Sequence, residues 1–177
     1  MIAIEKARPE NLGSIAAIYD EIHAEEEAGR AVIGWRRGVY PTYRTAALGV
    51  ERGDMYILRE NWVIRGAAVI NRLQLPEYAS GAWKYPAGED GALVLHTLVI
   101  SPAAAGRSLG RTFVAFYESL ARDTGASALR MDTNARNLRA RAFYRKLGYE
   151  EAGIVPTTFN GIPGVDLVLL EKRPPRD

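Results

Sequence analysis

The stretch from Leu95 to Gly110, LHTLVISPAAAGRSLG, joins a buried apolar strand, a proline-marked turn and a small-residue loop that leads into a helix. The first backbone N–H groups of a helix have no partner inside it and point along the positive end of its dipole, so they suit a pyrophosphate. Gly106, Ser108 and Gly110 keep large side chains away from these groups. The alternative is an ordinary small-residue turn, because the stretch matches neither a P-loop nor the G-x-G-x-x-G fingerprint.

A second segment, Asn137 to Tyr149, has the sequence NLRARAFYRKLGY. Its apolar residues recur at helical spacing, and Gly148 supplies a helix stop. Tyr144 carries a phenol that is protonated at neutral pH and can therefore deliver a proton. Taken alone, an aromatic residue on a helix is more often part of the core.

Together the two segments resemble the GCN5-related N-acetyltransferase (GNAT) family, whose cofactor motif reads Q/R-x-x-G-x-G/A and whose following motif reads approximately N-x-x-A-x-x-L-Y-x-x-x-G-F. The order and lengths of the other elements fit the whole chain. The resemblance implies an α/β (mixed α+β) fold with a central twisted, mostly antiparallel sheet of about seven strands, flanked by about four helices. It also implies acetyl-CoA as the co-substrate.

The cofactor motif falls on Ala105-Gly106-Arg107-Ser108-Leu109-Gly110. The final glycine is kept, whereas Ala105 replaces the usual Gln or Arg and Ser108 replaces the usual first glycine. These positions act mainly through backbone N–H groups, so small residues preserve the cradle, with one side-chain contact fewer and less room beside the phosphates. The departures leave a catalytically inactive acetyl-CoA-binding module as the alternative function.

The resemblance also assigns roles outside this motif. The backbone of Leu98, Val99 and Ile100 would pair with the pantetheine arm, and an N–H there would polarise the thioester carbonyl. Tyr144 would be the general acid near the cofactor sulfur, and Asn137 would contact the cofactor. Arg107 and Arg111 bracket the helix start, where their guanidinium groups could reach phosphate oxygens.

The general base, which takes a proton from the incoming amine, is less sharply defined. His96 is the preferred candidate, because it lies two residues before Leu98 on the same strand face and imidazole titrates near physiological pH. A single histidine in an apolar strand is, however, more often a hydrogen-bonded core residue. Asp132 and Glu60 are weaker candidates at predicted strand ends.

Four aromatic residues on irregular segments are the candidates for acceptor selection: Trp35, Tyr40, Tyr78 and Trp83. Aromatic walls beside acidic groups can hold a small amine by cation–π contact. The segment from Leu73 to Gly91 that carries two of them is long for a plain connector, and such loops are often functional. Aromatic residues that cap a core would give the same pattern.

Periodicity and turn signals predict the elements that position these residues. In chain order we expect a strand at Met1–Ala7, helices at Glu10–Ala28 and from Pro41 to Arg52, a hairpin of Met55–Arg59 with Trp62–Ile70, a strand at Ala92–Ile100, a helix at Ser108–Thr124, a strand at Ala128–Met131, a helix at Arg136–Leu147, and strands at Tyr149–Val155 and Val165–Leu170.

Composition narrows the class of protein. A chain of 177 residues fits one domain, expected over residues 1–177. A net charge of +2 is no nucleic-acid signature, and the absence of cysteine excludes disulfides and thiolate chemistry. The two histidines, His23 and His96, are not spaced with carboxylates as metal ligands. Neither a signal peptide nor a membrane span is recognisable, so we expect no membrane association and a cytoplasmic location.

We therefore expect an N-acetyltransferase that moves the acetyl group of acetyl-CoA to a primary amine by direct attack in a ternary complex. The acceptor is a small molecule or a peptide and is not specified further, and a longer acyl group and a homodimer stay open. A nucleic-acid-binding protein is a third function, suggested only by arginines on the predicted helices, and we expect no nucleic-acid partner.

Overall fold

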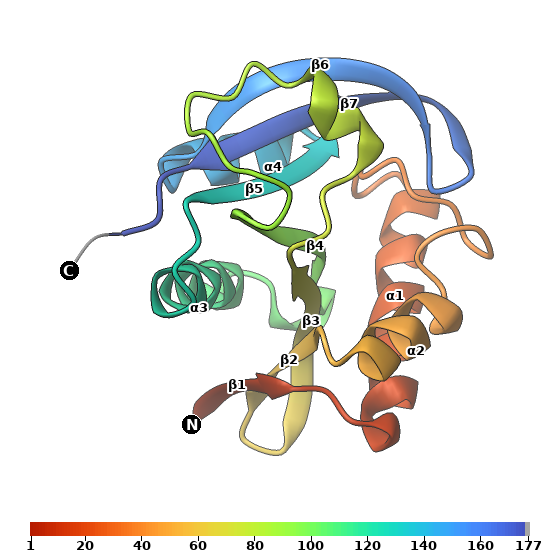
Figure 1. Cartoon of the computed structure of the whole chain (residues 1–177). Coiled ribbons are helices and arrows are strands. Elements are labelled where there is room, and N and C mark those ends of the chain that lie inside the picture. Colours follow the sequence, from red (N-terminus) through yellow and green to blue (C-terminus); the bar gives the residue numbers. More distant parts are fainter. Residues whose placement is uncertain (176–177) are drawn as a thin grey trace. The chain divides into compact units, whose positions relative to one another are not determined.

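The computed structural model describes residues 1–175 as a mixed α/β fold (Figure 1). The elements are β1 (Ile2–Lys6), α1 (Leu12–Glu27), α2 (Tyr43–Arg52), β2 (Met55–Glu60), β3 (Val63–Asn71), β4 (Ala92–Ile100), α3 (Leu109–Asp123), β5 (Ala128–Asn134), α4 (Leu138–Lys146), β6 (Glu150–Phe159) and β7 (Ile162–Lys172).

The seven strands form one sheet in the order β1-β2-β3-β4-β5-β7-β6. The β4–β5 pair is parallel, whereas β1–β2, β2–β3, β5–β7 and β6–β7 are antiparallel. The predicted fold class, a mostly antiparallel sheet of about seven strands with about four helices, is therefore confirmed.

The chain groups into two compact units. Unit 1 comprises Met1–Ala31, Trp35–Ile70 and His96–Phe116, and unit 2 comprises Val32–Gly34, Asn71–Leu95 and the chain from Tyr117 onward. The single domain expected over residues 1–177 stays a prediction.

The core of unit 1 lies between α1 and strands β2 and β3. Ile15, Ile18 and Tyr19 of α1 are buried, because their spacing places them on one helix face. They share a cluster with alternate strand residues, among them Met55 and Ile57 of β2. Val99 of β4 joins the same cluster, so this core fixes the strand that leads to the predicted cofactor turn.

The start of α2 differs from its sequence prediction. We expected the helix to begin at Pro41, but it begins at Tyr43, and Thr42 is its N-cap. The amide of Thr42 donates to Oγ1 of Thr45 at 3.0 Å, which forms half of a capping box. Pro41 therefore stays outside the helix, at the end of the α1–α2 connection.

Unit 2 contains the long antiparallel hairpin of β6 and β7, drawn in blue in Figure 1. Asn160 and Gly161 at its tip both have positive φ, +49° and +80°, as a two-residue type I′ turn requires. The Tyr117 hydroxyl donates to the carbonyl of Leu93 at 2.6 Å and accepts from the amide of Arg130 at 3.1 Å. These bonds attach the C-terminal part of α3 to the parallel β4–β5 pair.

Gly66 on β3 marks a close approach of two backbones in unit 1. A Cβ atom at this position would lie 2.8 Å from the carbonyl oxygen of Val99 and 2.6 Å from Cδ1 of Ile100. We expect Gly66→Ala to lower the free energy of unfolding by about 1–3 kcal/mol, measured by chemical denaturation, because the carbonyl cannot move without shifting β4.

Gly13 of α1 provides the control, since a Cβ there meets no atom within 4 Å. Gly13→Ala should raise the free energy of unfolding by roughly 0.5–1 kcal/mol through helix propensity. Equal stabilisation by both substitutions would contradict the close approach at Gly66.

No helix within residues 1–175 is long and apolar enough to cross a membrane.

Candidate active site

The predicted cofactor turn lies in unit 1 and has the backbone shape of an anion cradle. Gly106 and Ser108 both have positive φ, +78° and +59°, and α3 starts at the next residue, Leu109. The side chains from Ala105 to Ser108 are exposed, whereas Leu109 is buried and fixes the start of the helix. Within the described residues, the amides from 106 to 111 donate to no other backbone group. They are therefore available to an anion.

The two arginines beside the turn have different surroundings. Arg107 forms an ion pair with Glu60, at 2.7 Å between Nη2 and Oε1, and Arg65 Nε lies 3.7 Å from the other oxygen of Glu60. The Glu60 carboxylate thus lies between two arginines. Arg111 is exposed on the first turn of α3. Contact of either arginine with a phosphate stays a prediction.

The strand before the turn contains an irregular backbone position. Thr97, between His96 and Leu98, has a φ of +52°, which is uncommon for a residue other than glycine. Its hydroxyl forms a short hydrogen bond with the hydroxyl of Tyr40. Val99 is in the core, while His96 and Leu98 are only partly buried. The Thr97 position of β4 thus contacts the α1–α2 connection.

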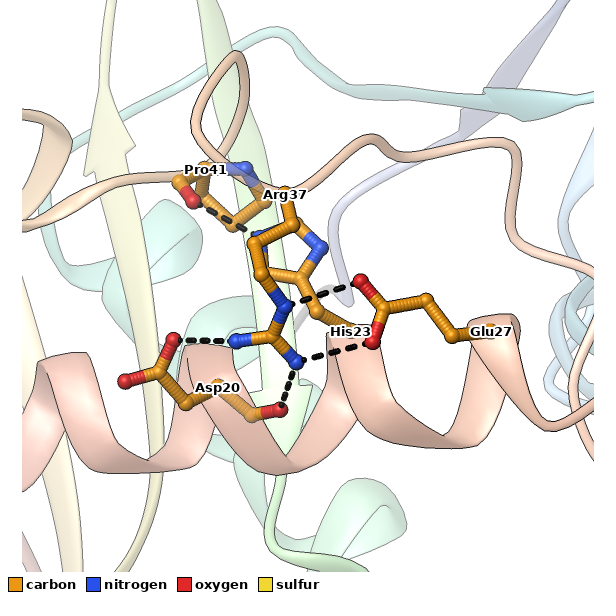
Figure 2. Close-up of polar contacts among 5 residues, drawn as sticks. All are labelled: Asp20, His23, Glu27, Arg37 and Pro41. Atoms are coloured by element: carbon orange, nitrogen blue, oxygen red, sulfur yellow. Dashed lines mark hydrogen bonds and ion pairs between the residues drawn. The ribbon is translucent and has the colours of Figure 1, made fainter.

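That connection is held onto α1 by a set of polar contacts (Figure 2). The guanidinium of Arg37 bridges Asp20 and Glu27, at 2.7 and 2.8 Å, and His23 Nε2 lies 2.9 Å from the carbonyl oxygen of Pro41. Because Arg37 and Pro41 stand on either side of Tyr40, these contacts restrain the segment that carries it. Arg37 also lowers the pKa of Glu27 through its hydrogen bond.

The predicted general acid lies in unit 2. Tyr144 is on α4, is 9% exposed, and packs edge-on against Phe143 and Tyr149 at 5.1 and 5.9 Å between ring centroids. No hydrogen bond within residues 1–175 uses its hydroxyl. Burial raises the pKa of this phenol, and the charge of Asp132 raises it further. Tyr144 is therefore protonated throughout the neutral range.

Asn137 has a structural function at the start of the same helix. It is the N-cap of α4, and its side-chain oxygen accepts the amide of Ala140 at 3.0 Å. The contact with the cofactor that the family motif implies for Asn137 stays a prediction.

A carboxylate that the sequence ranked low is a prominent feature of unit 2. Because β5 extends to Asn134 and not only to Met131, Asp132 lies inside a strand and not at its end. The hydroxyl of Tyr78 donates to Oδ2 of Asp132 at 2.7 Å. Burial raises the pKa of Asp132 to about 7, although the Tyr78 hydrogen bond lowers it and the charge of Glu77 raises it. This carboxyl group therefore titrates near neutral pH.

The four aromatic residues predicted to select the acceptor form two separate pairs. Trp35 and Tyr40 pack edge-on in unit 1, at 5.9 Å between centroids, and Tyr78 and Trp83 pack in unit 2 at 5.5 Å. Tyr78 is 2% exposed and is therefore held in the interior, while Trp35 packs against the unit 1 core. Acceptor binding by these four residues stays a prediction.

A model of the acetyltransferase (GNAT) family matches residues 15–149, which include the turn, β4 and Tyr144. The chain belongs to the GNAT family. The match covers most of the chain, and so confirms the resemblance carried by the turn and by the Asn137–Tyr149 segment. The two segments of this GNAT protein that lie outside the match contain β1 and the β6–β7 hairpin.

Among curated relatives, this GNAT protein is 29% identical over 108 residues to the uncharacterized N-acetyltransferase YesJ of Bacillus subtilis. The aligned region spans 59% of the present chain and 57% of YesJ.

Solved structures share its fold. A GNAT-family acetyltransferase from Streptococcus agalactiae superimposes with a TM-score of 0.82 at 22% identity, over 99% of this chain and 96% of that one. One from Listeria monocytogenes gives 0.73 at 20% identity, over 97% and 94% of the two chains.

Proposed function

We propose that this GNAT-family protein transfers the acetyl group of acetyl-CoA to a primary amine by direct attack in a ternary complex. The observation that carries the proposal is the exposed turn that leads into the fifteen-residue helix α3. Within the described residues, the amides from 106 to 111 donate to no other backbone group. A Cβ on Gly106 would meet no atom within 4 Å, so the turn leaves space for phosphate oxygens. The residues present therefore fit the co-substrate.

In this proposal the amides of residues 106–110 hold the pyrophosphate, and the backbone of Leu98 to Ile100 pairs with the pantetheine arm. The acceptor ammonium first loses one proton and so becomes a free amine that can attack. The amine nitrogen bonds to the thioester carbonyl carbon, and the C–S bond then breaks. Tyr144 gives its phenol proton to the departing thiolate, and the second proton that the acceptor nitrogen loses, after attack, passes through solvent and restores the phenol. Each turnover yields one amide, one thiol and one proton from the acceptor ammonium.

Ala105 and Ser108 suggested the alternative of a module that binds acetyl-CoA without turnover. Neither the family match nor the relatives support it, since the named relatives are acetyltransferases. Two measurements separate the functions. Calorimetry with acetyl-CoA should give saturable binding, and a thiol-release assay across a panel of small amines and peptide N-termini should identify acceptors. Binding without thiol release on any amine would favour the inactive module, and no binding would refute both.

A further inference from the structure

The Tyr78–Asp132 pair of unit 2 has no function in the chemistry described so far. Asp132 lies on β5, and Tyr78 lies in the short 3-10 turn Pro76–Ser80 of the segment before β4. We infer that Asp132 is the general base that takes a proton from the acceptor ammonium, and that Tyr78 is a positioning residue that holds its carboxylate. This inference rests on the proposed acetyl transfer.

The geometry of Asp132 is that of an oriented base. Its Oδ2 accepts the Tyr78 hydroxyl at 2.7 Å, and no other hydrogen bond to this carboxylate exists within residues 1–175. The side chain is only partly buried, so the second oxygen, Oδ1, remains open to a proton donor. One oxygen is fixed and the other is free, as a general base requires.

Tyr78 is well restrained for a positioning function. Its ring is buried, and its carbonyl oxygen accepts Nε1 of Trp83 at 2.7 Å. The Trp83 ring is covered on one side by the guanidinium of Arg130, whose Cζ lies 4.1 Å from the ring centroid. The segment is also attached to β7, because the buried carboxylate of Glu171 accepts the amide of Lys84 at 2.6 Å.

The charges around the pair adjust Asp132 for proton transfer near neutral pH. A solvent-exposed aspartate is too weak a base for an ammonium, whereas a pKa of about 7 combines basicity with a deprotonated fraction. Glu77, from the same turn, acts in the opposite direction to Tyr78 and accepts a hydrogen bond from Thr157 at 2.7 Å. On the strand side, Arg130 lowers the pKa of Tyr78, which burial and Asp132 raise.

The charge of Asp132 acts on the phenol of Tyr144 on α4, because it contributes to the raised pKa of this phenol. The environment thus separates the pKa values of the two groups. Above neutral pH the Asp132 carboxyl is ionised, while the Tyr144 phenol remains protonated. Pairs whose pKa values are pushed apart in this way are suited to act as base and acid in one reaction. In the balanced step, the Asp132 carboxylate takes one proton from the acceptor ammonium and later releases it to solvent.

The first test compares Asp132→Asn with His96→Gln in the pH dependence of kcat/KM. The wild-type profile should rise through a limb near pH 7, well below the limb of a free amine at about 10. Asp132→Asn should lose that limb and about 10²- to 10⁴-fold in rate, while His96→Gln keeps the limb. Loss of the limb in His96→Gln and its retention in Asp132→Asn would overturn the inference in favour of His96.

A second pair of variants tests the positioning function of Tyr78 through the direction in which the pH limb shifts. Tyr78→Phe removes a hydrogen bond to the ionised form, so the limb should move to higher pH by about one pH unit. The matched control, Glu77→Gln, removes a neighbouring negative charge and should move the limb to lower pH. A purely structural disturbance would not shift the limb in opposite directions, and shifts of the same sign would refute the positioning function.

Carboxyl ¹³C NMR makes the test independent of turnover. The Asp132 resonance, assigned by its absence in Asp132→Asn, should titrate near pH 7 in the wild type and at higher pH in Tyr78→Phe. If no amine is acetylated, the proposed function fails. The titration still tests whether the Tyr78 hydrogen bond controls the pKa of Asp132. A normal titration near pH 4 would overturn the inference, as would full activity of Asp132→Asn.

Discussion

Tyr144→Phe should lower kcat by about 100-fold while leaving the affinity for acetyl-CoA nearly unchanged. The thioester sulfur carries little charge in the bound co-substrate and becomes a thiolate as the tetrahedral intermediate collapses. A hydroxyl that donates to this atom therefore acts mainly on the transition state, so its removal affects turnover more than binding.

Two considerations place the expected loss at the lower end of the general-acid range of about 10²- to 10⁴-fold. A thiol with a pKa of about 8.5 is a tolerable leaving group and departs slowly without help. In addition, burial and Asp132 raise the pKa of Tyr144, which keeps the phenol protonated but makes it a weaker acid.

The fold should survive this substitution. No hydrogen bond within the described chain uses the Tyr144 hydroxyl, and the ring contacts with Phe143 and Tyr149 do not need it. Tyr149→Phe is the matched control, because the Tyr149 hydroxyl donates to Glu118 at 3.1 Å. It should reduce stability and leave kcat intact. Equal losses of affinity and rate in Tyr144→Phe would mark a binding residue, and no loss of either would mark core packing.

The parts of the fold governed by local sequence could be predicted closely. The strand Ala92–Ile100 has the bounds expected from its continuous apolar run, and α3 starts within one residue of the expected position. Both depend on periodicity over many neighbouring residues, which outweighs the influence of distant contacts.

The β6–β7 hairpin extends beyond the bounds that the sequence predicted for its two strands. We expected strands at Tyr149–Val155 and Val165–Leu170, but β6 continues to Phe159 and β7 begins at Ile162. Pro156 directly follows the expected end of the first strand, yet proline is tolerated on an edge strand, and β6 is at the edge of the sheet. The Asn160-Gly161 dipeptide was the signal that could have located the turn.

The candidate site was predictable only where one segment holds the whole motif. The turn at residues 105–110 was located from its own sequence, whereas the contact between Tyr78 and Asp132 joins positions 54 residues apart. No periodicity connects such residues. The one available signal was the surplus of aromatic residues in a long connecting segment, and it indicated acceptor binding, not a partner for a carboxylate.

The second large effect is expected at Gly110. Gly110→Val should weaken acetyl-CoA binding by about 100-fold in calorimetry, because a branched side chain in the first turn of α3 occupies the approach to the amides of the turn. Valine does not oppose helix formation more than glycine does, so the helix itself should persist. The loss would therefore fall on the ligand and not on the fold.

Gly110→Ala is the discriminating control, since the family motif accepts either glycine or alanine at this position. A single methyl group should leave binding within a few-fold of the wild type, so the step from alanine to valine isolates bulk from loss of glycine flexibility. If alanine and valine weakened binding equally, backbone freedom at Gly110 would be the requirement. If Gly110→Val bound acetyl-CoA as tightly as the wild type, the pyrophosphate could not lie on this turn, and the motif match at residues 105–110 would have no functional meaning.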